Sequence, residues 1–282
     1  MKLHITYDHP IPINVFEWTP ASYRQTPHVH TSLEIGLCLS GQGFFYFGTK
    51  RYPVRAGDIF LVNNMERHIA QSDPDDPSHY LFINFDAAML LAEEPELLLP
   101  FSYSSTHFCN HITADSPLAR QLAHWIHAIA EELHQKAPGY LALAKSALIQ
   151  LCGHLLRHNR GLLTDDERQS MVQSIRHSQS LAALVEQRHR EPIHLAELAD
   201  ELGLSVSRVS RAFLETTGYR FNEYVSLLRI QSAKHDLIST DKAITQIAFE
   251  CGFQSLPTFY RVFKTIVGTS PNVYRDSMGF LV

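Results

Sequence analysis

The chain has 282 residues, enough for two domains, and its 45% hydrophobic and 19% charged residues are ordinary for a globular protein. No apolar run approaches the roughly 20 residues of a transmembrane helix, and the N-terminus lacks the apolar core of a signal peptide, so we expect a cytoplasmic protein with no membrane partner. The net charge is −5, and 11 of the 24 Lys and Arg and 11 of the 29 acidic residues follow residue 177, so net charge alone predicts no polyanionic partner. The four widely spaced cysteines are predicted to be buried thiols, not a disulfide framework.

Up to about residue 85, short apolar runs alternate with turn residues. The runs LEIGLCL, FFYF and IFLV are separated by the turn sequences SGQG, GTKR and RAGD. Strands this short and this close together predict an antiparallel β-barrel or jelly roll, which we place at residues 1–110.

The sequence TPHVHTSLE, which leads into the first of these runs, places His28, His30 and Glu34 within seven positions. Alternation along a strand would put the three side chains on one side of a sheet. Imidazole and carboxylate groups bind divalent transition metals, so the spacing is that of half a metal site. The spacing leaves open whether the chain is a metalloenzyme or a protein that only senses a ligand.

From Ser116 the apolar period changes from 2 to 3.6, which predicts two helices separated by QKAPGY. We assign this pair to residues 111–158, as a dimer interface or as the completion of the N-terminal core. The polar, weakly patterned residues 159–177 are predicted to be a linker or the start of a helix. The predicted apolar faces are Leu118, Leu122, Ile126, Ile129 and Leu133, and then Leu141, Ala144, Leu148, Leu151 and Leu155.

The last hundred residues repeat themselves at an offset of 49 and then 50 residues. Seven matches in one register argue against an accidental periodicity in a helical interaction domain. The matching pairs are Ala199 and Ala248, Gly203 and Gly252, Leu204 and Phe253, Arg211 and Arg261, Phe213 and Phe263, Gly218 and Gly268, and Tyr224 and Tyr274.

Each copy has the pattern of a helix-turn-helix motif, at about residues 195–217 and 243–267. Gly203 can end the first helix in a left-handed conformation, and Ser205 can cap the second helix. The second helices are predicted to bury Val209 and Phe213 in the first copy, and Phe259 and Phe263 in the second. The predicted exposed residues are Val206, Ser207, Arg208, Ser210 and Arg211, and then Leu256, Pro257, Thr258, Tyr260 and Arg261.

A single helix is predicted between the two motifs, over residues 221–239. At about 1.5 Å per residue it would be about 28 Å long. A rod of that length would hold two recognition helices about one DNA turn (~34 Å) apart, so that both enter the major groove on one face of the duplex.

The second copy, IAFECGFQSLPTFYRVFKTIVGTSPNVYR, resembles the signature of the AraC/XylS family of bacterial transcription regulators, and the resemblance covers about residues 178–280. It implies a DNA-binding domain at residues 178–282. Leu256 and Pro257 replace the more usual polar residues, so contact with thymine methyl groups is expected there. Base and phosphate contacts both remain open for Arg211 and Arg261. The implied DNA-binding residues are Ser207, Arg208, Ser210 and Arg211 from the first recognition helix, and Leu256, Thr258, Tyr260, Arg261 and Lys264 from the second.

Many members of this family carry a cupin-like barrel ahead of the DNA-binding domain, and the N-terminal residues resemble a cupin. His28-x-His30-x3-Glu34-x6-Gly41 matches the first cupin motif. Gly57 and His68 supply parts of the second, in which Asn63 and Met65 replace the usual proline and glycine. The resemblance implies a divalent transition metal bound by His28, His30, Glu34 and His68.

The same resemblance allows a second role, because regulators of this family often keep these histidines without a metal. They would then bind a small, sugar-like effector, with Tyr46 and Phe85 also lining the pocket and Arg24 near its mouth. His28, His30, Glu34, Tyr46 and His68 are therefore the predicted ligand-binding residues.

The predicted fold class is α+β with two domains: a cupin-like β-barrel with an appended helical pair, then an all-α domain with two helix-turn-helix motifs. The predicted function is a sequence-specific transcription regulator and not an enzyme. It would be an effector-responsive activator of carbohydrate uptake or catabolism genes that binds double-stranded DNA as a homodimer and acts on RNA polymerase. The alternative is a metal-dependent cupin enzyme, of dioxygenase or isomerase type, fused to a DNA-binding module.

Overall fold

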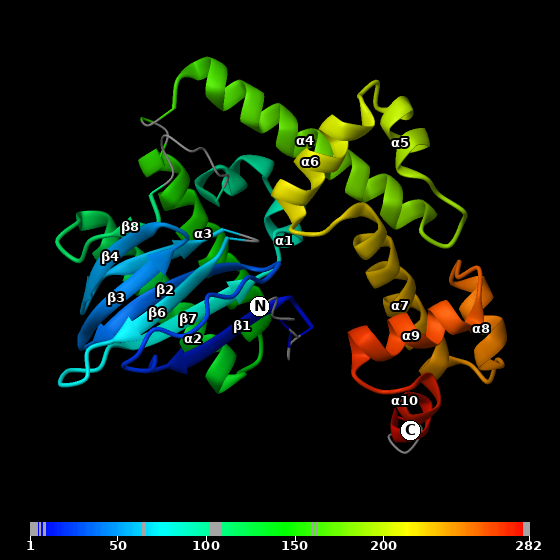
Figure 1. The fold of residues 1–282 in the computed structure, drawn as a ribbon, viewed down its shortest axis with the longest axis horizontal. Helices are drawn as coiled ribbons and strands as arrows, with labels where there is room; N and C mark the ends of the chain where they lie inside the picture. The colour runs from blue at the N-terminus through cyan, green and yellow to red at the C-terminus, as the bar shows by residue number, and fades with distance from the viewer. Residues whose placement is uncertain are drawn as a thin grey trace. The chain divides into compact units, whose positions relative to one another are not determined.

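The computed structural model describes residues 5, 7, 10–63, 66–101, 109–159, 161 and 163–278, so Met65 of the second cupin motif lies outside the described residues. Apart from Glu215–Gly218, which group with the first unit, the chain divides between Arg176 and His177 into a unit that contains the strands and a helical unit (Figure 1). This content confirms the predicted fold class, α+β with two domains.

Two antiparallel sheets form the barrel of the N-terminal unit. One sheet has five strands in the order β1-β7-β2-β5-β8, and the other has three in the order β4-β3-β6. The prediction of short antiparallel strands is confirmed. The strands are β1 Ile13–Trp18, β2 Leu33–Ser40, β3 Gln42–Phe47, β4 Lys50–Arg55, β5 Ile59–Val62, β6 His68–Ser72, β7 His79–Phe85 and β8 His111–Ile112.

The five-stranded sheet is buried on both faces, and this decides where each side chain lies. On β2, Leu33 and Ile35 belong to the core shared with the helices, whereas Glu34 between them lines the barrel interior. On β7, Ile83 faces the helices and Phe82 faces the interior. Because side chains alternate along a strand, the even-numbered residues of both β2 and β7 point into the barrel.

Four helical segments cover the outer face of this sheet: α1 Ala88–Leu91, the 3-10 helix η1 Pro95–Phe101, α2 Pro117–Gln135 and α3 Tyr140–Asn159. The helix α2 begins at Pro117, and the hydroxyl of Ser116 accepts a hydrogen bond from the Leu118 amide at 3.2 Å. Figure 1 shows α2 and α3 behind the strands, and their predicted apolar faces, apart from Leu141, pack into the core of this unit. The pair therefore completes the N-terminal core, and dimerisation through it stays a prediction.

Most of the predicted linker is helical. The helix α4, Asp165–Arg188, begins inside it and continues into the C-terminal unit. Val172 and Ile175 are buried in the N-terminal core, and Leu181 and Val185 are buried in the next one. Of the two expectations for residues 159–177, the start of a helix describes the structure better than a linker.

The helical unit contains the two predicted motifs. The first is α5 Leu195–Glu201 with α6 Val206–Thr217, and the second is α8 Ile244–Glu250 with α9 Leu256–Val267. The helix α7, Phe221–Ser239, has the bounds predicted for the connecting helix, and α10, Pro271–Met278, follows the second motif.

The connecting helix α7 belongs to two hydrophobic cores. Its first half contributes Phe221 and Val225 to a core with α4, α5 and α6, and its second half contributes Ile230 and Leu237 to a core with α8 and α9. Each motif thus has a core of its own, and one continuous helix joins the two.

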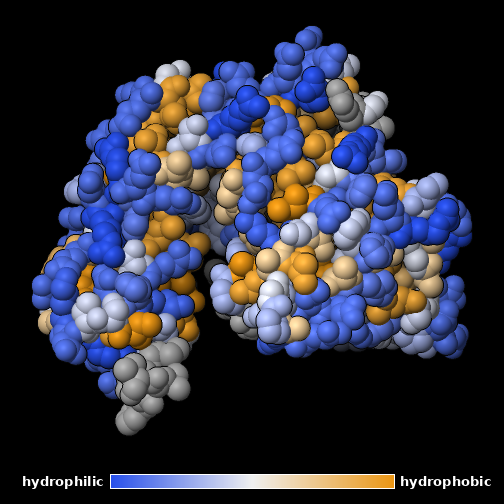
Figure 2. Space-filling view, turned by 180° about the vertical axis from the view of Figure 1, so that it is seen from behind, coloured by the Kyte–Doolittle hydropathy of each residue, from blue (hydrophilic) through white to orange (hydrophobic). Residues whose placement is uncertain are grey.

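Among the residues that the structure describes, no helix combines the length and the apolar composition needed to cross a bilayer. Hydrophobic residues reach the surface in patches between hydrophilic ones (Figure 2). Leu143 of α3 and Phe249 of α8 are among them, each with 54% of its surface exposed.

Candidate functional site

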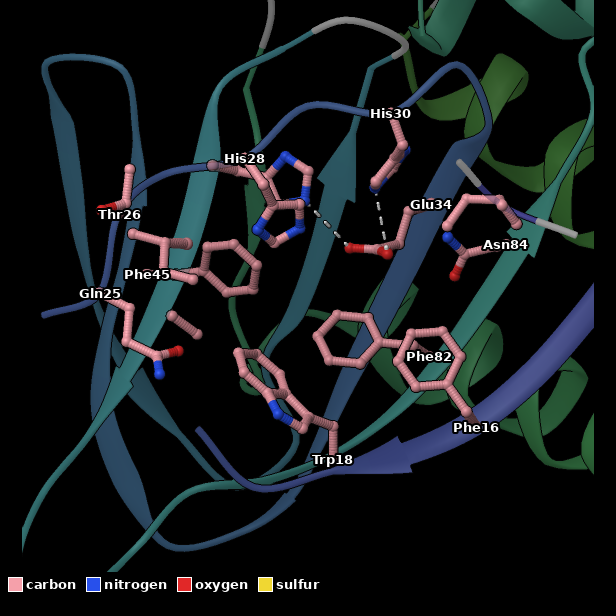
Figure 3. A pocket seen from close by; sticks show the side chains of 14 residues that line it. Phe16, Trp18, Gln25, Thr26, His28, His30, Glu34, Phe45, Phe82 and Asn84 are labelled. Atoms are coloured by element: carbon pink, nitrogen blue, oxygen red, sulfur yellow. Dashed lines mark ion pairs between the residues drawn. The ribbon is translucent and has the colours of Figure 1, made fainter. Parts of the chain in front are cut away.

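The barrel contains a cavity of about 580 Å³. In Figure 3 the histidines and Glu34 lie at one end of it, and the aromatic rings of Phe16, Trp18 and Phe82 lie at the other. The described residues that line it are Ile5, Phe16, Trp18, Gln25, Thr26, His28, His30, Glu34, Phe45, His68, Ile69, Ala70, Phe82 and Asn84.

The four predicted metal ligands meet in this cavity. Glu34 lies between two imidazoles, with 3.4 Å from Oε2 to Nε2 of His30 and 3.7 Å from Oε1 to Nε2 of His68. The ring of His28 packs against the ring of His68, with 4.3 Å between centroids. The side chains of His30, Glu34 and His68 are buried, and that of His28 is partly buried.

The backbone brings these residues together by a different route from the predicted one. His28 and His30 precede β2 instead of continuing it. His28 forms an isolated antiparallel bridge with His68, the first residue of β6, in which each amide donates to the other carbonyl at 3.1 Å. A turn then separates His30 from Glu34, so the predicted strand alternation does not place the histidines.

The donor set fits a divalent metal ion. His30 donates from Nδ1 to the carbonyl of Ser32 at 2.9 Å, and His68 donates from Nδ1 to the carbonyl of Glu66 at 2.8 Å, in the tautomer that satisfies both carbonyls. Nε2 of each histidine faces the Glu34 carboxylate, and it is buried and without a hydrogen-bond partner among the described residues. Metal-binding histidines commonly have this outer hydrogen bond to a carbonyl.

The spacing of the ligand atoms agrees with shared coordination. The ligand nitrogens of His28, His30 and His68 all lie within 4.8 Å of one another. Two atoms bound tetrahedrally at about 2.1 Å from one metal are about 3.4 Å apart. The separations of 3.4 and 3.7 Å between Glu34 and the imidazoles are close to that value.

Burial sets the protonation of the site. It lowers the pKa of His68 to about 4 and also lowers the pKa of His28, in both cases against the opposing charge of Glu34. Burial alone would raise the pKa of Glu34, but the interactions with His30, His68 and His28 outweigh it and hold this pKa below its usual value. At neutral pH the site therefore contains a carboxylate and a neutral His68, which is the protonation state that a metal ion requires.

Two residues predicted to line the pocket lie elsewhere. Tyr46 lies on β3 and faces away from the barrel interior. Its hydroxyl donates to Gln71 at 3.2 Å, and the guanidinium group of Arg24 stacks on its ring at 4.2 Å. Phe85 faces the helices and packs against Phe101, with 5.6 Å between ring centroids. Neither is among the residues that line the cavity.

Asn84 is a lining residue that the sequence reasoning missed. It lies on β7 opposite Glu34 of β2 and is 1% exposed. The alternation that places Phe82 inside also places Asn84 inside, so the register of β7 is the signal that would have found it.

The two helix-turn-helix motifs have equivalent turns. The amide of Leu204 donates to the carbonyl of Ala199 at 2.9 Å, and the amide of Phe253 donates to that of Ala248 at 3.1 Å. The intervening Gly203 and Gly252 have φ values of +67° and +90°. The predicted left-handed conformation is confirmed, and it explains why glycine occurs in both copies.

The recognition helices α6 and α9 expose most of the side chains that the pattern predicts, but Leu256 and Tyr260, which were predicted to be exposed, pack against the core of the second motif. Val209, Phe213, Phe259 and Phe263 are buried in the two cores. The hydroxyl of Ser205 accepts a hydrogen bond from the Arg208 amide at 3.4 Å, near the start of α6. Ser207, Arg208, Ser210, Arg211, Pro257, Thr258, Arg261 and Lys264 are exposed, and Leu256 and Tyr260 are partly buried.

Other arginines hold this unit together. Arg229 of α7 donates to the carbonyls of His189 at 2.6 Å and Glu191 at 2.9 Å. Arg275 donates to the carbonyls of Leu237 at 3.1 Å and Lys242 at 2.8 Å. These guanidinium groups bind backbone within the unit.

Comparison with family models gives two matches. The model of an AraC-like ligand-binding domain matches residues 10–152, and that of a helix-turn-helix domain matches residues 198–277. The first match covers just over half of the chain.

Similar proteins of known sequence include transcription regulators. An uncharacterized HTH-type transcriptional regulator of Staphylococcus aureus (strain COL) is 27% identical over 255 residues, which are 86% of this chain and 31% of that protein. The chain thus spans about a third of the length of that relative. The HTH-type transcriptional activator RhaS of Yersinia pestis is 25% identical over 252 residues, 89% of each chain.

Among solved structures, ToxT of Vibrio cholerae O395 aligns over 95% of this chain and 98% of its own, with 16% identity and a TM-score of 0.45. The C-terminal domain of AraT, a response regulator from Geobacillus stearothermophilus, aligns over 36% of this chain with 25% identity and a TM-score of 0.35.

Proposed function

The chain belongs to the AraC family of DNA-binding transcription regulators, and we propose that it is an effector-responsive activator of genes for carbohydrate uptake or catabolism. The observation that carries the regulatory part is the pair of equivalent turns, each followed by a helix with an exposed polar face. The relative RhaS, which is named as an activator and is similar over 89% of both chains, favours activation. The protein would act in the cytoplasm, where bacterial DNA lies.

The recognition helices would read the operator. From α6 we assign the contacts to Ser207, Arg208, Ser210 and Arg211, because hydroxyl and guanidinium groups can bond base edges or phosphates in the major groove. From α9 the contacting residues would be Leu256, Thr258, Tyr260, Arg261 and Lys264. All nine are at least partly exposed, as such contacts require.

The barrel would bind the effector. Its cavity combines an aromatic end with polar groups, a lining typical of small-molecule sites. Aromatic rings can cover the apolar face of a sugar ring, while the histidines and Glu34 bond its hydroxyls. The protein would exist in two arrangements, of which one binds DNA and the other does not. The effector would shift the equilibrium between them only to the extent that it binds one arrangement more tightly than the other.

The site would also hold a divalent transition metal such as iron, zinc, nickel or manganese, through His28, His30, Glu34 and His68. The support is the two buried Nε2 atoms of His30 and His68, which face the carboxylate of Glu34 and have no hydrogen-bond partner among the described residues. A metal there would supply a Lewis-acidic centre to which a hydroxyl of the effector could bind. The protein's own contribution is to fix the two imidazoles through the carbonyls of Ser32 and Glu66.

A homodimer formed through α2 and α3 would bring two DNA-binding units to one operator. The exposed Leu143 on α3 supports this face as an interface. Two linked units bind more tightly than one because the second binding event occurs at a high effective concentration. The dimer would then act on RNA polymerase at a neighbouring promoter.

The first test is elemental analysis of protein purified without an affinity tag or chelator, beside a His30→Ala/Glu34→Ala variant. We expect close to one metal ion per chain in the native protein and loss of the metal from the variant. Metal-free native protein that still binds DNA would refute the metal and leave the regulator. Specific duplexes recovered from a random DNA pool would support the regulator, and failure to recover any would count against it.

The alternative function, a metal-dependent cupin enzyme joined to a DNA-binding module, is favoured by one observation: the ligand set opens onto a cavity large enough for a substrate. Metal-dependent conversion of a bound sugar, lost in the His30→Ala/Glu34→Ala variant, would support it. Release of the sugar unchanged after prolonged incubation with metal-loaded protein would exclude it for that compound.

A further inference from the structure

Asn84 has a side-chain oxygen that the protein leaves without a partner. Its Nδ2 donates to the hydroxyl of Ser32 at 3.3 Å, and its Oδ1 has no hydrogen-bond partner among the described residues. The residue is 1% exposed and lines the cavity, where Figure 3 shows it beside Glu34. A buried acceptor without a hydrogen-bond donor destabilises the folded protein. A molecule bound in the cavity could supply the missing donor.

The position of Asn84 is fixed from two sides. Its backbone pairs with Asn14 of β1 and with Glu34 of β2, in the middle of the five-stranded sheet. Its amide is tied to Ser32, whose hydroxyl lies 3.1 Å from Nδ1 of His30. The acceptor is therefore held in place before any occupant binds, next to the proposed metal ligands.

The remaining lining narrows the chemistry of the occupant. Phe16 and Phe82 stack with 5.4 Å between ring centroids, and Trp18 lies 6.1 Å from Phe82. Among the described lining residues Glu34 is the one carboxylate, and none is Lys or Arg. In the metal-free site an anionic group would thus meet a carboxylate and an amide oxygen without a side-chain cation, whereas a neutral hydroxyl can donate to both.

We propose that Asn84 is a specificity-determining residue that accepts a hydrogen bond from a hydroxyl of the effector, and that the effector is a neutral polyhydroxylated compound with one apolar face. The inference rests on the proposed function of the barrel as an effector site. It predicts that the protein binds neutral sugars in preference to their acid derivatives. It also gives Asn84 a role in binding the effector that differs from the role of the four proposed metal ligands.

The test is ligand binding to the full chain, by thermal shift and then calorimetry, with neutral pentoses and hexoses, their deoxy analogues and the matching uronic acids. We expect at least one neutral sugar to bind, and, in chelated, metal-free protein, its uronic acid to bind at least ten-fold more weakly. Asn84→Leu, which removes the acceptor, should weaken the sugar at least ten-fold. Asn84→Asp, which keeps an acceptor oxygen, should bind more tightly than Asn84→Leu.

Asn63 offers a matched control. It is also a buried asparagine whose Oδ1 has no partner among the described residues, but it does not line the cavity. Asn63→Leu should leave sugar affinity within two-fold of the native value. If Asn84→Leu does not fold, the deoxy analogues test the same bond from the ligand side, because removal of one hydroxyl should cost at least ten-fold in the native protein.

The outcomes separate this inference from the proposed function. If no sugar binds, the sugar-like effector is wrong and the inference falls with it. If a sugar binds equally well to Asn84→Leu, or if each deoxy analogue binds like its parent, the effector stands and the inference is overturned. The series is repeated after chelation to separate a hydroxyl that bonds Asn84 from one that binds the metal. If the effect of a deoxy analogue disappears in the metal-free protein, the hydroxyl bound the metal and the inference is also overturned.

Discussion

The two helix-turn-helix motifs have the same turn and present different surfaces. Each turn has an amide-to-carbonyl bond across five residues and a glycine with positive φ, at Gly203 and at Gly252. Both helices begin with an apolar residue, Val206 and Leu256, but Ser207 and Arg208 follow in α6 where Pro257 and Thr258 follow in α9. The buried positions repeat because they make the turn, whereas the turn sets no requirement on the exposed positions.

The largest difference that we expect between the motifs is in stability. A Cβ on Gly203 would meet nothing within 4 Å, whereas one on Gly252 would lie 2.7 Å from the carbonyl oxygen of Arg190 and 2.9 Å from Nε of Arg229. Gly203→Ala should cost about 1 kcal/mol for the left-handed conformation alone. Gly252→Ala should cost about 3 kcal/mol, because the overlap adds about 1–3 kcal/mol.

Urea denaturation of the two variants beside the native chain measures this difference. Gly252→Ala should also weaken the bond from Arg229 to the carbonyl of His189. Equal losses of unfolding free energy would show that the second turn is no more crowded than the first.

A smaller effect is expected on DNA binding. Arg211→Ala and Arg261→Ala should each cost about 1–3 kcal/mol on a selected operator if these arginines read bases. Titration of each variant against the operator and against scrambled DNA distinguishes the two roles left open by the sequence. A loss of the same size on both duplexes would assign that arginine to phosphate.

The smallest effect concerns the start of α9. If Leu256 and Pro257 contact thymine methyl groups, replacing thymine with uracil in the half-site of α9 should weaken binding by about 0.8 kcal/mol per methyl group. The same replacement in the half-site of α6 should have little effect, and Leu256→Ala should reduce the difference. Competition binding with the substituted duplexes measures it, and equal sensitivity of the two half-sites would contradict the assignment.

The helical unit could be predicted closely because its information is local. A glycine that ends a helix and apolar residues at a period of 3.6 fix each motif within about twenty residues, and the bounds of α7 agree with the prediction. The DNA contacts stay predictions, since exposure permits a contact without establishing it.

The side chains that face the barrel interior were harder to predict, because successive side chains of a strand point to opposite faces of the sheet. A shift of one residue sends a side chain to the opposite face, and the two misplaced lining residues each lie one position from a correct one. Phe45 lines the cavity where Tyr46 was expected, and Asn84 does where Phe85 was expected. The pairing of strands decides between such neighbours: β7 with β2 for Asn84 and Phe85, and β3 with β6 for Phe45 and Tyr46.

The histidine site shows a further limit. His28 and His30 were expected on the strand of Glu34, yet they reach it from a separate segment that pairs with His68. The family resemblance identified the residues correctly as neighbours, because a resemblance transfers a spatial arrangement that the alternation of a strand does not contain.

The sharing of α7 also bears on how such a domain can change over evolutionary time. Phe221 and Val225 complete one core and Ile230 and Leu237 complete the other, so each half of the helix packs with its own motif and the helical backbone between the halves joins the two. Each motif with its half of α7 is therefore a unit that recombination within this helix could exchange. If the exposed residues read DNA, exchange of a whole motif would be a second route to a new operator preference, beside replacement of single residues.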